Sequence, residues 1–212
     1  MELDLRSTDR LTVSGQTGTG KSTFTAFIAA LAMPALLLWD PLDQYQGFKT
    51  VTIEQIEAGR SFTRFGNRFV PLEDTQQEFE RVCTALRSMS EITFIVEECE
   101  QYIGQDKPLG AEARRLINRG RNWGVGVYAV TRRIQDLNKS FFDLCRIAIF
   151  FRAGLRSYDY IKSMVGAEVL EVIKNLPDRY FVVYNAETGQ WFKATLELDA
   201  NSSAVSSVGS SS

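Results

Sequence analysis

The octapeptide GQTGTGKS, at residues 15–22, narrows the possible folds of this chain of 212 residues more than any other segment. The run LTVS precedes it and reads as a β-strand, and the run TFTAFIAAL follows it and reads as a helix. Glycines allow the backbone N–H groups of such a loop to converge on a phosphate, which the positive N-terminus of the helix also attracts. Lys21 would reach the β and γ oxygens of a nucleotide, and Ser22 would supply an oxygen to Mg2+. The predicted nucleotide-binding residues are Gly15, Gln16, Thr17, Gly18, Thr19, Gly20, Lys21, Ser22 and Thr23.

Short apolar runs rich in β-forming residues recur along the chain, as expected for strands buried on both faces of a parallel sheet. The predicted strands are 11–15, 35–40, 92–97, 125–130, 146–151 and 180–184. Helical patterns, which parallel strands need as crossovers, cover 20–33, 75–89, 111–121 and 157–176. The sequence therefore predicts a layered α/β domain. The strand and helix around the octapeptide favour a phosphate-binding loop over the alternative, a glycine-rich turn with an accidental lysine.

Two additions to this core are expected. The interval 48–72, with the runs FKTVTI, SFTRF and RFVPL, predicts small strands inserted after the second strand. The segment NAETGQWFKATL, from Asn185, predicts a closing antiparallel hairpin. Because no repeat or linker divides residues 1–198, we expect one domain there, followed by a serine-rich disordered tail over 199–212.

Composition excludes several kinds of chemistry. The chain has no histidine, so a Ser-His-Asp triad or a histidine-ligated zinc is impossible and general base work must fall to carboxylates. Its three cysteines are spaced too widely for a metal knuckle, and we expect reduced, buried thiols. The longest apolar run, 27–39, is interrupted by Pro34 and too short to span a membrane, which favours an intracellular soluble protein. A formal charge of −2 requires any nucleic-acid contact to come from a local patch.

A second carboxylate feature follows the run ITFIV at 92–96. Glu97 and Glu98 would stand at the carboxyl end of a buried strand, where open α/β sheets bind ligands. Glu97 is the predicted partner of the Mg2+ shell, and Glu98 is predicted to polarise the water that attacks the γ-phosphate. In the alternative interpretation, Glu98 and Glu100 are first-turn acids that favour a helix N-terminus.

Arginines cluster around the next predicted strand. If that strand lies between the phosphate-loop strand and the ITFIV strand, its end points at the γ-phosphate, which makes Thr131 and Arg132 candidate sensors. Before the strand, Arg119 and Arg121 flank Gly120, where a guanidinium could reach the nucleotide of a neighbouring subunit. The alternatives are solvated arginines that cap a strand and a solvated helix face.

These motifs, in their order, resemble the FtsK-HerA superfamily of ring-forming, DNA-pumping P-loop ATPases. The resemblance covers about residues 11–166 and is carried by VSGQTGTGKST, LLLWDPLDQY, FIVEE, NRGRNWGVGVYAVTRR and CRIAIFFRAGLRSYDYIKSMVG. The residues that match the family's further motifs are Asp40, Pro41, Asp43, Tyr45, Gly120, Arg121, Gly124, Thr131 and Arg133. Arg132 replaces the family's glutamine, which suggests a charged sensor. The resemblance implies a three-layer RecA-like core, and the lack of extra domains is most like the compact genome-packaging ATPases of tailless internal-membrane viruses.

The resemblance implies an ATPase that uses ATP and Mg2+, assembles as a homo-oligomeric ring, a hexamer, and drives double-stranded DNA into a preformed capsid. Its expected location is the infected cell's cytoplasm or the packaging vertex of the virion, beside a capsid or internal-membrane protein. Lys107 and Lys139, in loops after two central strands, are candidate DNA contacts or ordinary surface lysines. Alternative functions are a small-molecule phosphotransferase, a conjugation or repair DNA pump, a switch GTPase and a nonenzymatic nucleotide-binding scaffold. The GTPase is disfavoured because Asn138-Lys139 is followed by Ser140-Phe141, not by a guanine-reading continuation.

Overall fold

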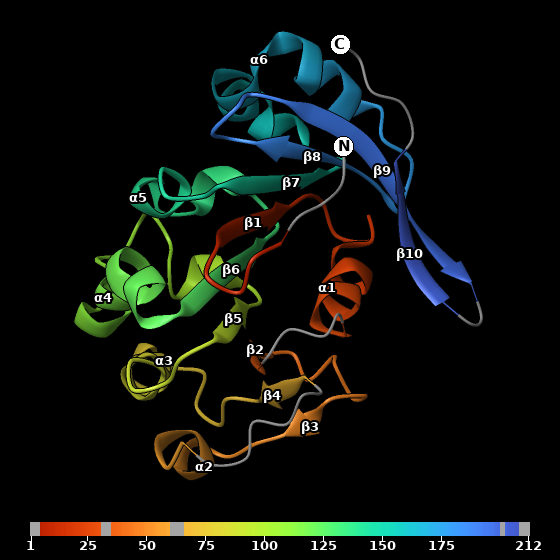
Figure 1. The fold of residues 1–212 in the computed structure, drawn as a ribbon. Helices are drawn as coiled ribbons and strands as arrows, with labels where there is room; N and C mark the ends of the chain where they lie inside the picture. Colours follow the sequence, from red (N-terminus) through yellow and green to blue (C-terminus); the bar gives the residue numbers. More distant parts are fainter. Residues whose placement is uncertain (1–4, 31–34, 60–65, 200–201, 208–212) are drawn as a thin grey trace.

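The computed structural model of the chain describes residues 5–30, 35–59, 66–199 and 202–207, and their strands form one sheet (Figure 1). The order across the sheet is β10-β9-β8-β7-β1-β6-β5-β2-β4-β3. The strands from β7 to β3 in this order are parallel, whereas β8, β9 and β10 extend the other edge in antiparallel fashion. This arrangement confirms the predicted α/β core with its mainly parallel sheet.

The strands are β1 (Arg10–Ser14), β2 (Ala35–Trp39), β3 (Lys49–Thr50), β4 (Asn67–Phe69), β5 (Ile92–Val96), β6 (Val125–Thr131), β7 (Ile147–Phe151), β8 (Tyr180–Asn185), β9 (Trp191–Asp199) and β10 (Ser202–Ser207). The α-helices are α1 (Lys21–Ala30), α2 (Ile53–Glu57), α3 (Gln76–Leu86), α4 (Ala111–Arg119), α5 (Lys139–Phe142) and α6 (Tyr158–Lys174). Short 3-10 helices are η1 (Cys99–Gln101), η2 (Gly120–Trp123), η3 (Ile134–Asp136) and η4 (Leu155–Ser157).

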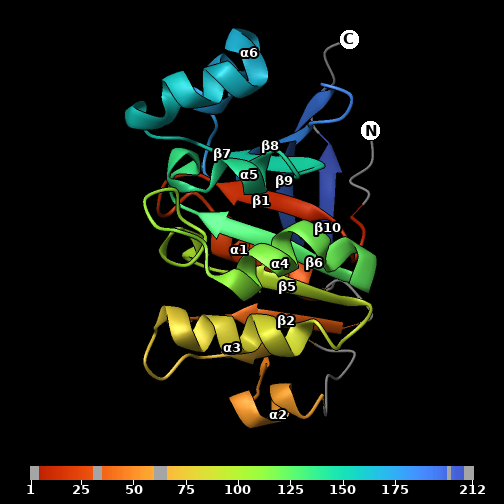
Figure 2. The same ribbon diagram turned by 90° about the vertical axis from the view of Figure 1, so that its left-hand side faces the viewer.

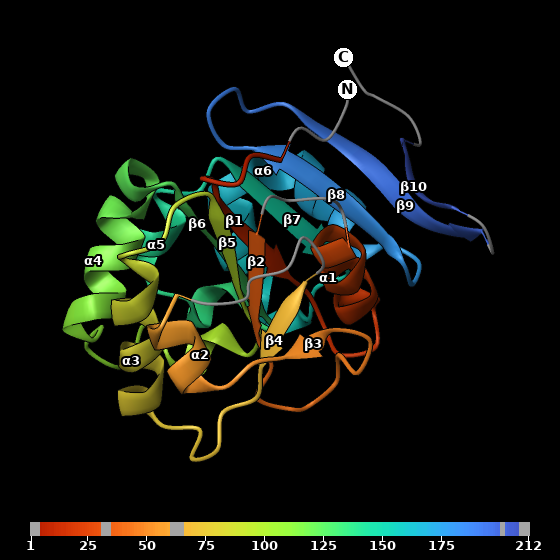
Figure 3. The same ribbon diagram turned by 60° about the horizontal axis from the view of Figure 1, so that its bottom comes forward.

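The central strands are buried on both faces because helices cover both sides of the sheet. Helix α1 packs on one face, where Phe24 contributes to an apolar cluster with Val13. Helices α3, α4 and α6 pack on the other face through side chains that include Phe79, Leu116 and Ile161. Figures 2 and 3 show α1 on one side of the sheet and α3 and α4 on the opposite side. The molecule therefore has the predicted three layers.

The insertion after β2 differs from its predicted form. Strands β3 and β4 are present, but α2, which was not predicted, begins at Ile53, the last residue of the run FKTVTI, and continues between the predicted strands. Thr52 and Gln55 form a reciprocal capping box at its start, and Ile53 and Ile56 bury one face three residues apart. These local bonds outweigh the β-propensity of the isoleucines. The predicted run SFTRF, at 61–65, lies outside the described residues.

The C-terminal part confirms the antiparallel hairpin, since β8 pairs with β9. It also differs from expectation, because β10 lies within the serine-rich segment that was predicted to be disordered and pairs antiparallel with β9. The edge of β9 offers backbone N–H and C=O groups, so a segment without a core can still pair through its main chain. Residues 200–201 and 208–212 of that segment lie outside the described part of the chain.

Two further sequence predictions can be compared with the structure. All three cysteines are buried and unpaired, as expected. Helix α6 is interrupted at Gly166, whose φ of 87° and ψ of 170° are not helical. Within the described residues, none of the helices combines the length and the apolarity that crossing a membrane would need.

Candidate nucleotide-binding site

The carboxyl ends of the parallel strands place most of the predicted site residues at one edge of the sheet. The phosphate loop follows β1, Glu97 follows β5, and Arg132 follows β6. Strand β6 pairs with both β1 and β5, as the sensor argument required. Parallel strands that end together bring their following loops together, so three segments far apart in sequence meet at this edge.

The phosphate loop, residues 15–22, needs glycine at two positions for steric reasons. A Cβ on Gly15 would lie 2.6 Å from the Cβ of Phe151, and Gly20 combines a φ of 110° with close packing on Arg179. The ring of Phe24, at the start of α1, packs edge-on against Phe151 and Phe181, with centroids 5.9 and 4.9 Å away. Helix α1 and its preceding loop are therefore held firmly against β7 and β8.

The backbone of this loop is free to bind an anion. None of the N–H groups from Thr17 to Thr23 donates a hydrogen bond to another described residue. The Nζ of Lys21 donates to the carbonyl oxygen of Gln16 at 2.9 Å, so the lysine folds back over the loop. Burial lowers the pKa of Lys21, and the carboxylates of Glu97 and Glu98 oppose this shift. Unpaired N–H groups, a helix N-terminus and an ammonium group together make a cradle for phosphate.

An open cavity of about 570 Å³ lies over the loop. Its walls bring together the phosphate loop, the acids after β5, the residue after β6 and two further segments. The lining residues are Thr17, Gly18, Gly20, Lys21, Ser22, Thr23, Leu42, Gln44, Glu97, Glu98, Arg132, Asp178 and Arg179. Most of the predicted nucleotide, metal and carboxylate residues therefore border one cavity.

Glu97 is a buried carboxylate held by a tyrosine. Its side chain accepts a hydrogen bond from the hydroxyl of Tyr45, and the residue is only 5% exposed. Burial raises the pKa of Glu97, while the Tyr45 hydroxyl and the charge of Lys21 lower it. Glu97 and Ser22 both line the cavity.

Tyr45 is positioned by a second buried carboxylate, Asp40, at the end of β2. Asp40 is fully buried and accepts hydrogen bonds from the backbone N–H groups of Gln44 and Tyr45 at 2.9 and 3.0 Å. It also forms an ion pair with Arg68, at 3.0 Å. Sequence reasoning singled out Asp40 and Tyr45 by resemblance but missed Arg68, whose contact with Asp40 depends on the pairing of β4 with β2.

Glu98 forms a two-bond ion pair with Arg132. The Nε of Arg132 donates to Oε1 at 3.1 Å and its Nη2 donates to Oε2 at 2.6 Å. Glu98 has a φ of 48°, which is rare for a residue with a side chain and is found mostly where a site requires it. The alternative of a helix-favouring acid finds no support, because Glu98 precedes only the three-residue η1 and makes no capping hydrogen bond.

The other predicted site residues lie elsewhere. Thr131 is 1% exposed, and its Oγ1 bonds to the backbone of Arg133, so it does not line the cavity. Arg119 and Arg121 precede β6, at the amino edge of the sheet, opposite the phosphate loop. Both are exposed, and neither side chain forms a hydrogen bond or ion pair with a described residue. They cannot reach the nucleotide cavity of their own chain.

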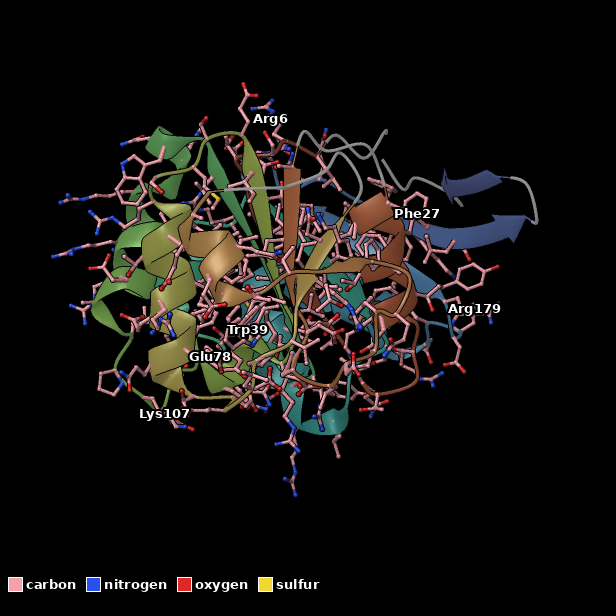
Figure 4. All side chains as sticks on the ribbon, turned by 90° about the horizontal axis from the view of Figure 1, so that it is seen from below. Arg6, Phe27, Trp39, Glu78, Lys107 and Arg179 are labelled. Carbon is pink, nitrogen blue, oxygen red and sulfur yellow. The ribbon has the colours of Figure 1, made fainter. Side chains whose placement is uncertain are left out.

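Lys107 lies in the loop after β5, whereas Lys139, which was also predicted to lie in a loop, is the first residue of α5. A bridge between Gly104 and Leu137 joins the segments after β5 and β6, and both lysines are exposed. Lys107 borders an open cavity of about 420 Å³. Figure 4 places Lys107 and Arg179 on opposite sides of the sheet, so this cavity is separate from the nucleotide cavity.

Sequence reasoning missed the far wall of the nucleotide cavity. Arg179 reaches the phosphate loop because β8 pairs with β7, and its backbone N–H donates to the carbonyl of Thr19 at 2.8 Å. Asp178 pairs with Arg152, at 2.8 Å between Nη2 and Oδ1. The turn Pro177-Asp178-Arg179 carried no motif, and only the strand order reveals that it borders the site.

The residues present fit a nucleotide with Mg2+. The free N–H groups and Lys21 suit the phosphates, and the Ser22 hydroxyl and the Glu97 carboxylate are hard oxygen donors of the kind Mg2+ prefers. Glu97 would act on the metal ion through bound water, because its carboxylate is engaged by Tyr45.

Comparisons with known proteins agree with this geometry. No family model matches the sequence. The chain is 27% identical over 180 residues to Protein P9 of Pseudoalteromonas phage PM2, across 79% of this chain and 80% of that protein.

Among solved structures, the genome packaging NTPase B204 of Sulfolobus turreted icosahedral virus 2, in complex with AMPPCP, has a TM-score of 0.75 at 16% identity. The match covers 89% of this chain and 98% of that one. VirB4 of Thermoanaerobacter pseudethanolicus has a TM-score of 0.63 at 9% identity and covers 91% of this chain and 90% of that one. The resemblance noted in the sequence is thus confirmed for the fold, which this chain shares with a viral genome-packaging NTPase.

Proposed function

We propose that this chain is an ATPase of the FtsK-HerA type that assembles as a hexameric ring and packages double-stranded DNA into a preformed viral capsid. The observation that carries the proposal is the convergence of Lys21, Glu97 and Glu98 on one cavity, above a loop whose N–H groups are free. The fold shared with the packaging NTPase B204 and the relative from phage PM2 support it.

The roles of the residues follow from their positions. The loop N–H groups and Lys21 bind the β- and γ-phosphates of ATP, and Ser22 and the Glu97 carboxylate hold the hydrated metal ion. Mg2+ supplies charge neutralisation to the phosphates when it is bound. Glu98, on the same wall, orients the attacking water and accepts its proton. Arg132, paired with Glu98, is the charged sensor at the γ-phosphate end, and Thr131 shapes the turn behind it.

Three substitutions test the hydrolytic site. Lys21→Ala should weaken nucleotide binding and abolish hydrolysis, because the lysine charge acts on the phosphates in both the ground state and the transition state. Glu98→Gln should keep ATP bound and lose turnover, because an amide preserves shape but cannot accept the proton. Nucleotide titration and phosphate release measure the two effects. Normal turnover in the Lys21 variant would reject the site, and loss in Glu97→Gln but not in Glu98→Gln would exchange the two carboxylate roles.

Ring assembly is tested through the arginines at the amino edge. We propose that Arg119 or Arg121 completes the nucleotide site of a neighbouring subunit, since neither can reach its own. Turnover per subunit should then rise with protein concentration as the ring forms. A Lys21→Ala subunit, which keeps its arginines, should restore activity when mixed with an Arg121→Ala subunit. No recovery for either arginine, despite proven co-assembly, would reject the proposal.

DNA is the proposed substrate of the motor, with Lys107 and Lys139 among its contacts from the paired segments after β5 and β6. Each subunit needs few contacts, because the copies in a ring sum their attraction for phosphate. Long double-stranded DNA should therefore stimulate the ATPase, and an unchanged rate would reject translocation. A conjugation-type DNA pump stays a second candidate, and a phosphorylated small-molecule acceptor would instead indicate a phosphotransferase.

We place the working ring at the packaging vertex, in the infected cell or on the virion, against a capsid or internal-membrane protein. Co-purification of the chain with capsid assemblies, lost when the vertex protein is removed, tests this location. Recovery of all the chain apart from assembling capsids would contradict it.

A further inference from the structure

An open groove of about 700 Å³ lies beside the nucleotide cavity, and most of its lining residues are polar. Its lining residues are Gln16, Thr17, Arg132, Arg133, Gly154, Leu155, Arg156 and Ser157. Three of them carry a guanidinium and none carries a carboxylate. The chain as a whole has a formal charge of −2, so a groove with three guanidiniums and no lining acid has the opposite sign to the molecule's net charge. We refer to it as the arginine groove.

Two of these guanidiniums lack a partner. Arg133 and Arg156 are exposed, and neither side chain forms a hydrogen bond or ion pair within the described part of the chain. Many other exposed arginines are paired, as Arg81 is with Glu57 and Arg115 is with Glu112. The free charges of the groove are therefore available to an external anion.

The arginine groove is directly connected to the nucleotide cavity. Thr17 and Arg132 line both of them, so the phosphate loop and one arginine form the partition. The side-chain amide of Gln16 packs against Gly154, and its backbone N–H donates to the carbonyl of Arg152 at 2.9 Å. Lys21 donates to the carbonyl of the same Gln16. An occupant of the groove would therefore contact the back of the phosphate loop.

Arg132 can serve only one anion fully at a time. On the cavity side it forms its two hydrogen bonds with Glu98, yet its side chain is still 52% exposed. An anion in the groove competes with Glu98 for the same guanidinium, because Arg offers a planar set of donors that favours bidentate partners. Once Arg132 turns to the groove, the carboxylate of Glu98 is free to bind and deprotonate water.

We propose that the arginine groove binds the phosphate backbone of double-stranded DNA and that this contact withdraws Arg132 from Glu98, which switches on hydrolysis. The proposal rests on the proposed function and adds to it the site and the means of stimulation. A polymer of phosphates fits better than a single small anion, because Arg133 and Arg156 come from two different loops and can each neutralise a separate phosphate. A carboxylate of a neighbouring subunit is the competing occupant.

Duplex binding as a function of salt tests the site. Removing two phosphate contacts should reduce the slope of log affinity against log salt by about 1.8, so Arg133→Ala/Arg156→Ala should bind duplex DNA more weakly and with that flatter slope. Neither residue lines the nucleotide cavity, so ATP binding should be unchanged. The matched control is Arg81→Ala/Arg115→Ala, which removes the same charge from exposed positions on α3 and α4 and should keep the wild-type slope.

Stimulation tests the link to Glu98. The Arg133→Ala/Arg156→Ala variant should lose DNA stimulation of the ATPase. Arg132→Gln should still bind the duplex through the other two arginines, and its rate without DNA should rise to the DNA-stimulated level because no ion pair restrains Glu98, so that the ratio of rates with and without DNA falls to about one. Loss of turnover both with and without DNA would instead leave Arg132 the sensor role alone and overturn the release of Glu98.

The possible outcomes distinguish failure of this inference from failure of the proposed function. A wild-type slope in the double variant, or a wild-type stimulation ratio in Arg132→Gln, would overturn the inference while leaving the proposed DNA motor intact. Smaller oligomers for the double variant in sedimentation, with the control still assembled, would assign the groove to a neighbouring subunit instead. If the wild-type chain neither binds nor responds to DNA, the proposed function itself is refuted, and this inference with it.

Discussion

Replacing Tyr45 by Phe should displace the pH dependence of the ATPase, because the Tyr45 hydroxyl is the donor that stabilises the ionised form of buried Glu97. A hydrogen bond to a charged group contributes about 1.5–3 kcal/mol. Losing that bond should raise further the pKa of Glu97, which burial already raises. The acid limb of the rate profile should therefore move to higher pH.

The direction in which pH changes the stability of the chain follows from the same raised pKa of Glu97. Because the pKa of Glu97 is raised in the folded chain, its ionisation opposes folding, and the protonated form is favoured at low pH. Stability from this group is therefore complete below the pKa of the unfolded chain and is lost as pH rises through the folded pKa. Tyr45→Phe should lower the free energy of unfolding more at neutral pH than in acid, which urea titrations at both pH values measure.

The control is Tyr184→Phe, a half-buried tyrosine of β8 whose hydroxyl has no hydrogen-bond partner in the described part of the chain. Its rate profile and its stability at both pH values should match the wild type. Coincident acid limbs for wild type and Tyr45→Phe, measured at saturating Mg2+, would refute the role of the tyrosine. A loss of stability equal at both pH values would show a packing defect instead.

Other expected outcomes concern folding and binding. Gly15→Ala should abolish nucleotide binding in calorimetric titration, because its Cβ would meet the Cβ of Phe151 at 2.6 Å; ordinary binding would show that the loop can move away. Arg68→Met should destabilise the chain by about 3–5 kcal/mol in urea unfolding, since it leaves buried Asp40 unpaired, and adding Asp40→Asn should recover part of the loss. Thr75→Ala should cost only about 1 kcal/mol through the lost N-cap of α3, and a loss several times larger would contradict a local effect.

Much of the core could be predicted because its signals are local. An apolar run of consecutive β-formers specifies a strand wherever it is buried on both faces, and the phosphate loop is one contiguous motif. Helix α2 was missed because the interval 48–72 was read only for its β-forming runs, and the capping box of Thr52 with Gln55 was the decisive signal. That signal was visible in the sequence and went unused.

The parts of the site that could not be predicted depend on strand order. Arg68 reaches Asp40 only because β4 lies beside β2, and Arg179 reaches the phosphate loop only because β8 turns back along β7. The arginine groove has the same origin, since Arg133 follows β6 and Arg156 follows β7, two strands that flank β1. Residue type and spacing contain no information about such pairs until the sheet is assembled.

The distribution of charge between the two edges of the sheet implies two separate conditions for hydrolysis. At the carboxyl edge, one chain provides the phosphate loop and both glutamates, but Glu98 is tied to Arg132. At the amino edge, Arg119 has no partner among the described residues and lies too far away to serve its own nucleotide. If both proposals hold, a lone subunit binds ATP without hydrolysing it, because it lacks a neighbour's arginine and a DNA phosphate to release Glu98. Turnover is then confined to assembled rings that hold DNA, which is where hydrolysis can do mechanical work.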